Sequence, residues 1–165
     1  ELHGLKRKER RALERRWRKE KRRTVPSPSA VFRYLAAFHE EGEERQRQIG
    51  RAFIPRPNGH LAGWSHVNKD LVAFLQSKRG EKTATLDMDA TLAQTHKAGA
   101  LYCYEHYKAY QPLNTYWAEQ GVVLHTEFRD GNVPAGYEQL RVLKQALEQL
   151  PEGVEKIRLR SDTAQ

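Results

Sequence analysis

Three aspartates, Asp87, Asp89 and Asp162, have the residue type and spacing that metal-dependent phosphodiester chemistry requires. Asp87 and Asp89 stand two apart in residues 83–89, where every second residue is apolar, so both carboxylates belong to one face of a predicted strand. Asp162 follows a second such pattern, in residues 156–160. Carboxylates are ligands that Mg²⁺ or Mn²⁺ prefers, and two such ions can activate an attacking oxygen and stabilise a leaving one.

Aspartate is uncommon inside β-strands, and two acids within one apolar strand call for an ion or a charged partner. We therefore interpret Asp89 and Asp162 as candidate catalytic acids and metal ligands for two Mg²⁺ or Mn²⁺ ions, with Asp87 as a reserve ligand. The alternative for each aspartate is an ordinary turn residue or a solvated charge.

Positive charge is concentrated near the N-terminus. Residues 6–23 hold 12 Lys or Arg and 3 Glu, a local charge of +9, whereas the whole chain carries +8, so the remaining residues sum to −1. Such an arm neutralises phosphates and releases their counterions, which indicates a nucleic-acid partner; the alternative is a solvated tail. The predicted DNA-binding residues are Lys6, Arg7, Lys8, Arg10, Arg11, Arg15, Arg16, Arg18, Lys19, Lys21, Arg22 and Arg23.

The cysteine count and the hydropathy of the sequence bear on disulfides, on membrane spans and on the compartment of the protein. The single cysteine, Cys103, excludes an internal disulfide and fits a reducing compartment. No stretch is apolar over the length that a bilayer requires, so we expect a cytoplasmic protein with no membrane partner. The chain begins at Glu1 and ends at Gln165 inside an apparent motif, and we expect a fragment of a longer protein.

The first half of the sequence predicts helices and loops. Helix formers fill residues 6–23, and Ser29 is the expected N-cap of a short second helix. Proline and glycine predict a loop over residues 51–60. Asn68 is the expected N-cap of a helix over residues 69–77.

The second half predicts a sheet. The strand at residues 83–89 is followed by a tyrosine-rich connection, whose rings are expected to pack on the sheet, with stacking on nucleic-acid bases as the alternative. Residues 112–118 and 122–128 then predict an antiparallel hairpin. A helix is expected between Pro134 and Pro151. The strand at residues 156–160 follows.

The predicted order is therefore strand, strand, strand, helix, strand, which is the order of the ribonuclease-H-like α/β fold. In that fold the first and fourth strands are parallel neighbours, and a helix supplies the crossover between them. Asp89 and Asp162, 73 residues apart in sequence, would then lie side by side.

Three segments are expected along the chain. Residues 1–50 form a basic helical DNA-binding appendage, residues 51–82 a linker and helix, and residues 83–165 a partial ribonuclease-H-like catalytic domain whose C-terminal part is missing.

Four short motifs resemble the DDE transposases of bacterial insertion sequences, in particular the transposase DDE domain group 1 family. They are the Asp, variable residue and Thr that close the run 85–91, the Pro-Leu element at 111–113, the Arg-Asp-Gly-Asn element at 129–132, and the Arg-x-Asp strand end at 160–162. The resemblance extends over residues 83–164, about half the chain.

The resemblance implies a metal-dependent enzyme that cuts DNA at the ends of a mobile element and joins it to target DNA. Asp89, which precedes the x-Thr, corresponds to the first catalytic acid and Asp162 to the second. The third acid of the family, a Glu on a later helix, has no counterpart here, so the 165-residue chain alone is expected to be inactive. A homo-oligomer is possible in the full-length enzyme. Glu138 is a weaker metal candidate, with a solvated helix residue as the favoured alternative.

Two other readings stay open. The chain could be a non-catalytic DNA-binding remnant of a broken mobile element, or part of a ribonuclease-H-like nuclease that only hydrolyses its substrate. The missing C-terminal helix would distinguish the nuclease from the transposase.

Overall fold

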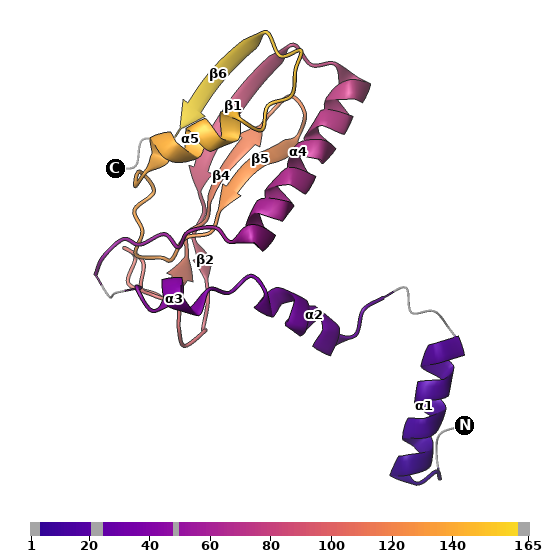
Figure 1. The fold of residues 1–165 in the computed structure, drawn as a ribbon. Helices are drawn as coiled ribbons and strands as arrows, with labels where there is room; N and C mark the ends of the chain where they lie inside the picture. The colour runs from indigo at the N-terminus through magenta and orange to yellow at the C-terminus, as the bar shows by residue number, and fades with distance from the viewer. Residues whose placement is uncertain (1–3, 21–24, 48–49, 162–165) are drawn as a thin grey trace. The chain divides into compact units, whose positions relative to one another are not determined.

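The computed structural model describes residues 4–20, 25–47 and 50–161. The chain divides into two compact units, residues 1–39 and residues 40–165, and each is described by itself. Helices α1 and α2 belong to the first unit; a mixed sheet and the remaining elements belong to the second (Figure 1).

The first unit contains two helices. Helix α1, Arg7–Glu20, has Glu9 in its first turn, and the Glu9 carboxylate accepts a hydrogen bond from the backbone N–H of Lys6 at 3.0 Å. Helix α2, Pro28–Ala36, is capped by Ser27, whose hydroxyl accepts from the Ala30 N–H at 3.2 Å. The expected cap at Ser29 is wrong because proline is well suited to the first helical position, which moves the cap to the residue before it.

Helix α2 buries none of its residues. Val31, Phe32, Tyr34 and Leu35 are all exposed, although Tyr34 stacks edge-on against Phe38 with ring centroids 5.2 Å apart. Among the described residues of the first unit, none therefore forms an apolar core with α2.

The second unit opens with the short helix α3, Glu41–Glu44, and the long helix α4, Gly59–Arg79. The sequence interpretation is wrong about α4, which begins ten residues before the expected Lys69. The Asn58 side chain caps the helix by accepting hydrogen bonds from the backbone N–H groups of His60 and Leu61. Asn68 lies inside the helix. Asn68 donates to the carbonyls of Val123 and Leu124, so its polarity reflects a tertiary contact and not a helix end.

Four strands form the main sheet: β1 Thr83–Ala90, β4 Leu113–Trp117, β5 Val122–Glu127 and β6 Lys156–Ser161. Their order is β5-β4-β1-β6. The β4–β5 hairpin and the β4–β1 pair are antiparallel, whereas β6 runs parallel to β1. The structure thus confirms the predicted hairpin and the predicted parallel pairing of first and last strands in an α/β arrangement.

A second, two-stranded sheet was not expected. Strands β2, Ala93–Gln94, and β3, Ala109–Tyr110, pair within the tyrosine-rich connection. Tyr102 and Tyr104 are exposed, so the expectation that these tyrosines pack on the main sheet is wrong for both. Strands of two residues leave too short an alternation to be read from sequence.

One face of the main sheet carries the core. Leu86, Trp117 and Leu124 are buried there against Val72 of α4. Helix α5, Gln139–Leu147, adds Leu143 and Leu147 to the same cluster. It begins five residues after Pro134, later than expected. Glu138 has a left-handed φ of 49°, and a turn occupies the intervening residues.

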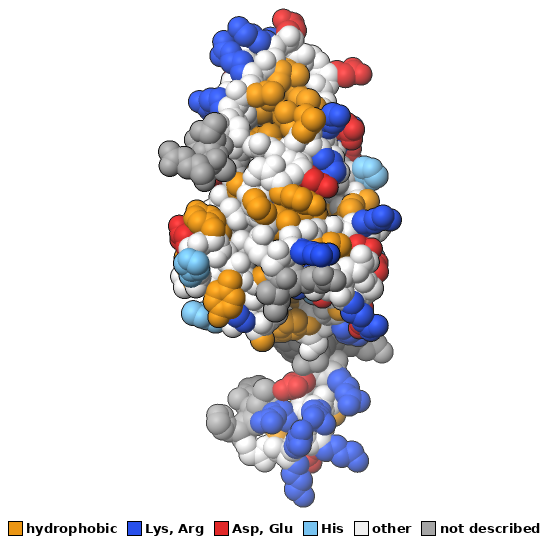
Figure 2. Space-filling model, turned by 90° about the vertical axis from the view of Figure 1, so that its left-hand side faces the viewer, with side chains coloured by type: hydrophobic (Ala, Val, Ile, Leu, Met, Phe, Trp, Pro, Cys, Tyr) orange, Lys and Arg blue, Asp and Glu red, His pale blue; other side chains and the backbone are white. Residues whose placement is uncertain are grey.

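Strand β6 is exposed along its whole length. Ile157 and Leu159 share the side of the sheet that carries the core, as the sequence predicts, yet they remain half exposed. Figure 2 views the side of the molecule where β6 and α5 lie in Figure 1 and shows hydrophobic side chains at the surface.

Candidate metal centre and nucleic-acid interface

Strand β1 places Asp87 and Asp89 on the same face of the sheet, opposite to the buried Leu86 and Met88. Asp89 is exposed at the end of the strand, and its Oδ2 accepts a hydrogen bond from the Thr91 hydroxyl at 3.3 Å. Asn114 of β4 stands opposite Asp89 in the antiparallel register. Asp89 therefore presents its carboxylate to solvent.

Asp87 is bound by Arg160 of β6, its direct partner in the parallel register. The Arg160 Nη2 donates to Asp87 Oδ2 at 2.6 Å, and the Arg160 Nε donates to Asp87 Oδ1, so both carboxylate oxygens are engaged. The hydrogen bond to Asp87 raises the pKa of Arg160 above its ordinary value. The sequence analysis did not predict this ion pair, although the spacing indicates it. Asp87 lies two positions before Asp89, and Arg160 lies two positions before Asp162.

Of the two candidate catalytic acids, Asp89 lies within the described residues and Asp162 does not. The parallel register runs from Thr83–Lys156 to Met88–Ser161, and Asp162 lies outside the described residues. Within residues 4–20, 25–47 and 50–161 no group of three or more His, Cys, Asp or Glu side chains converges on one point. Asp89, an exposed carboxylate beside the Thr91 hydroxyl, suits one edge of a Mg²⁺ or Mn²⁺ site in its donor type.

Glu138 is turned toward a different partner. Its carboxylate accepts a hydrogen bond from Arg141 Nε at 2.6 Å, and Arg141 Nη2 lies 2.6 Å from Glu127 Oε2. Burial alone would lower the pKa of Arg141, but the hydrogen bonds that Arg141 donates to Glu127 and Glu138 raise it. Glu138 is thus held in an arginine network.

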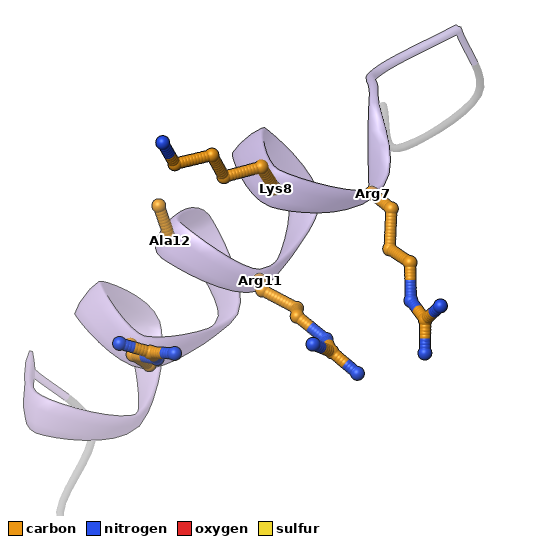
Figure 3. A pocket seen from close by; sticks show the side chains of 5 residues that line it. Arg7, Lys8, Arg11 and Ala12 are labelled. Carbon is orange, nitrogen blue, oxygen red and sulfur yellow. The ribbon is translucent and has the colours of Figure 1, made fainter.

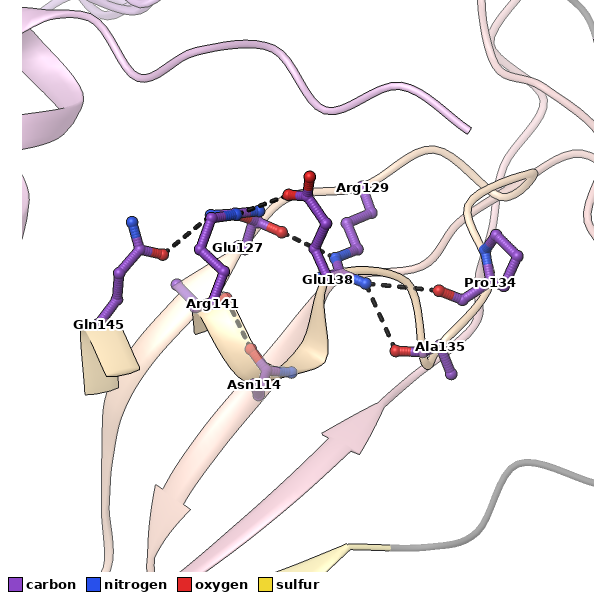
Figure 4. Close-up of polar contacts among 9 residues, drawn as sticks. Asn114, Glu127, Arg129, Pro134, Ala135, Glu138, Arg141 and Gln145 are labelled. Carbon is purple, nitrogen blue, oxygen red and sulfur yellow. Dashed lines mark hydrogen bonds and ion pairs between the residues drawn. The ribbon is translucent and has the colours of Figure 1, made fainter. Parts of the chain in front are cut away.

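The Arg129 side chain lies at the centre of this network and is fully buried. Its Nε donates to Glu127 Oε1 at 2.9 Å, and its Nη1 reaches the carbonyls of Pro134 and Ala135 at 3.4 Å each (Figure 4). The first residue of the Arg-Asp-Gly-Asn element therefore holds together the strand end of β5 and the turn that leads into α5.

The next two residues of the element also have structural roles. Asp130 forms an ion pair with Arg47, with Nε and Oδ2 2.7 Å apart, and burial raises the pKa of Asp130 while Arg47 opposes the shift. A Cβ on Gly131 would stand 2.7 Å from the carbonyl oxygen of Ala109, so only glycine fits there.

Helix α1 carries the predicted nucleic-acid interface. Arg7, Lys8, Arg11 and Arg15, with Ala12, line an open hollow of about 480 Å³ along this single helix. Arg7 and Arg11 project from the same side of the helix (Figure 3), since residues four apart share a face. The described side chains of this helix, through Arg16, are nearly all exposed.

The remaining predicted DNA-binding residues are described in part or not at all. Lys6, Arg10 and Arg16 are exposed. The backbone of Arg18 and Lys19 belongs to α1, and nothing is described of their side chains. Lys21, Arg22 and Arg23 lie outside the described residues.

No family model, no curated protein and no solved structure matches this chain. Among the helices of the described part of the chain, none combines the length and the apolar character needed to cross a membrane.

Proposed function

We propose that this chain is the DNA-binding and partial catalytic portion of a DDE-type transposase with a ribonuclease-H-like core. The observation that carries the proposal is the sheet order β5-β4-β1-β6, with β6 parallel to β1 and the exposed Asp89 at the end of β1. Strand β6 ends at Ser161, one residue before the second candidate acid.

The local contacts support Asp89 over Asp87 as the metal ligand. Asp87 has both oxygens bound by Arg160, whereas among the described residues the Asp89 carboxylate accepts only the long hydrogen bond from Thr91. A carboxylate already paired with arginine offers less negative charge to a cation. The ion pair also ties β1 to β6 two residues before each acid, which holds the two strand ends together.

In this proposal Asp89 and Asp162 hold Mg²⁺ or Mn²⁺, and the third acid comes from outside these 165 residues. Bound metal ions supply activation of the attacking oxygen and stabilisation of the leaving oxygen. The residues of the chain hold the carboxylates close together and bring the DNA phosphate backbone near by means of the basic helix α1.

The test is cleavage of end-labelled element DNA by the full-length protein in Mg²⁺. Asp89→Asn and Asp162→Asn are each expected to abolish cleavage while DNA binding persists, because α1 and not the acids holds the DNA. Asp87→Asn is expected to keep part of the activity. Normal cleavage by both Asp89→Asn and Asp162→Asn would overturn the proposal.

A non-catalytic DNA-binding remnant is the second candidate, and the exposed basic side chains of α1 favour it, because DNA binding needs no acid pair. The two candidates differ in the effect of Mn²⁺. Both candidates bind DNA without the Asp89 carboxylate, but a remnant shows no Mn²⁺ site near β1, whereas the transposase portion binds Mn²⁺ there through Asp89.

A further inference from the structure

The main sheet has a second face, turned away from α4 and α5. The residues of this face alternate along each strand with the residues of the core. Asp87 of β1, for example, lies between its two register partners, Tyr116 of β4 and Arg160 of β6. We call this surface the open face and define it by Asp87, Asp89, Tyr116, Lys156, Arg158 and Arg160. The helices α4 and α5 contribute their buried side chains to the opposite face.

Strand β6 gives the open face a row of positive charges. Lys156, Arg158 and Arg160 alternate along the strand, so their side chains share a face, about 6.6 Å apart at about 3.3 Å per residue. Arg160 is taken by Asp87, and the Glu119 carboxylate also acts on it electrostatically. No ion pair is recorded for Lys156 or Arg158 in the described part of the chain, and both are exposed.

The row has a direction. Because β6 is parallel to β1, the sequence Lys156, Arg158, Arg160 advances toward the end of β1 where Asp89 stands. A phosphate backbone that followed the two unpaired cations would therefore be led toward the candidate acids.

An aromatic side chain lies across β1 from this row. Tyr116 is the direct partner of Asp87, and 40% of its surface is exposed. Single-strand binding surfaces combine a basic track for phosphates with aromatic rings on which unpaired bases stack. A duplex cannot use such a ring in this way, because its bases are already stacked on one another.

We infer that the open face binds single-stranded DNA, with Lys156 and Arg158 on successive phosphates and Tyr116 stacked on a base. The inference rests on the proposed function, since it makes the open face the path by which a DNA strand reaches Asp89. It concerns binding alone and needs neither metal nor cleavage.

The test is photocross-linking of the 165-residue chain, in EDTA, to an oligo-dT that carries 5-iododeoxyuridine. Mass spectrometry of the digested product is expected to find the cross-link at Tyr116. The Lys156→Gln/Arg158→Gln variant should reduce the cross-link yield. At low occupancy, where the yield is proportional to affinity, it should also lower the slope of log yield against log salt by about 1.4, at about 0.7 for each of two single-strand phosphate contacts.

The matched control is Lys78→Gln/Lys144→Gln, which removes the same charge from exposed positions on α4 and α5. This control variant should keep the Tyr116 cross-link yield of the original chain. The melting curves of both double variants should match the melting curve of the original chain. The inference is overturned if cross-links form only in the N-terminal arm, if the two double variants behave alike, or if duplex DNA cross-links to Tyr116 as well as the single strand.

Failure of this inference and failure of the proposed function are separable. A chain that cross-links at Tyr116, in a protein whose Asp89→Asn variant still cleaves DNA, keeps the open-face site and loses the transposase proposal. The reverse result keeps the acids and removes the single-strand path.

Discussion

Asp87 and Asp89 are residues of the same type two positions apart, yet their carboxylates have different hydrogen-bond partners. Asp87 and Asp89 cannot be told apart by spacing, since both stand on the same face of β1. The structure separates them through Arg160, which binds Asp87 with its Nε and Nη2 groups, and through the exposure of Asp89. The sequence could place both acids in a strand, but it could not show which arginine would reach one of them.

Gly131 allows a stability prediction. Gly131→Ala puts a Cβ 2.7 Å from the Ala109 carbonyl oxygen and 3.1 Å from that of Leu101, both backbone atoms that cannot move aside. We expect urea denaturation to show a loss of about 1–3 kcal/mol in the free energy of unfolding. Gly136→Ala is the control, because no atom lies within 4 Å of the added carbon. Equal stability of the two variants would show that the β3 backbone yields freely.

His125 predicts a dependence of stability on pH. Burial lowers the pKa of His125 below its ordinary value of 6.5, while Glu127 opposes the shift. The unfolded chain therefore binds this proton more readily than the folded chain, so the stabilisation is present above pH 6.5 and is lost as the pH falls through the folded pKa. His125→Gln should flatten the urea-derived stability curve in this range. A slope that the variant leaves unchanged would assign the effect to other groups.

At the scale of elements, the strands were predictable and the helix ends were not. Alternation of apolar and polar residues located β1, β4, β5 and β6 within one or two residues. The start of α4 was missed because Pro55, Pro57 and Gly59 predicted a loop over residues 51–60 and Asn68 resembled a helix cap. The contact of Asn68 with β5 is a tertiary fact that no local pattern contains.

Helix α1 predicts salt-dependent DNA binding. Replacing Arg7, Lys8, Arg11 and Arg15 by glutamine should lower duplex affinity and reduce the slope of log affinity against log salt by up to about 3.6, at about 0.9 per phosphate. Fluorescence anisotropy across a salt series measures both quantities. Lys69, Lys78, Lys97 and Lys144, all exposed, provide a control with the same change in charge. An unchanged slope in the α1 variant would make this helix a solvated appendage.

At the scale of the whole molecule, exposed apolar surface predicts self-association. Leu61, Trp64, Val67, Leu71 and Phe74 are each about half exposed on α4, as are Ile157 and Leu159 on β6. Patches of this kind associate in water. We expect sedimentation velocity to show concentration-dependent oligomers of the 165-residue chain, reduced by Ile157→Thr/Leu159→Thr. A monomer at all concentrations tested would contradict this.

The whole account depends on Asp89 binding a divalent cation, and Mn²⁺-induced broadening of amide NMR signals tests this on the 165-residue chain. The account predicts selective broadening of signals near Asp89, Thr91 and Asn114, which lie together at this end of β1 and β4. Asp89→Asn should remove the broadening, and Asp87→Asn should retain it. If Asp89→Asn binds Mn²⁺ at the same place as the original chain, or if Asp87→Asn alone abolishes the site, the assignment of the metal centre is wrong.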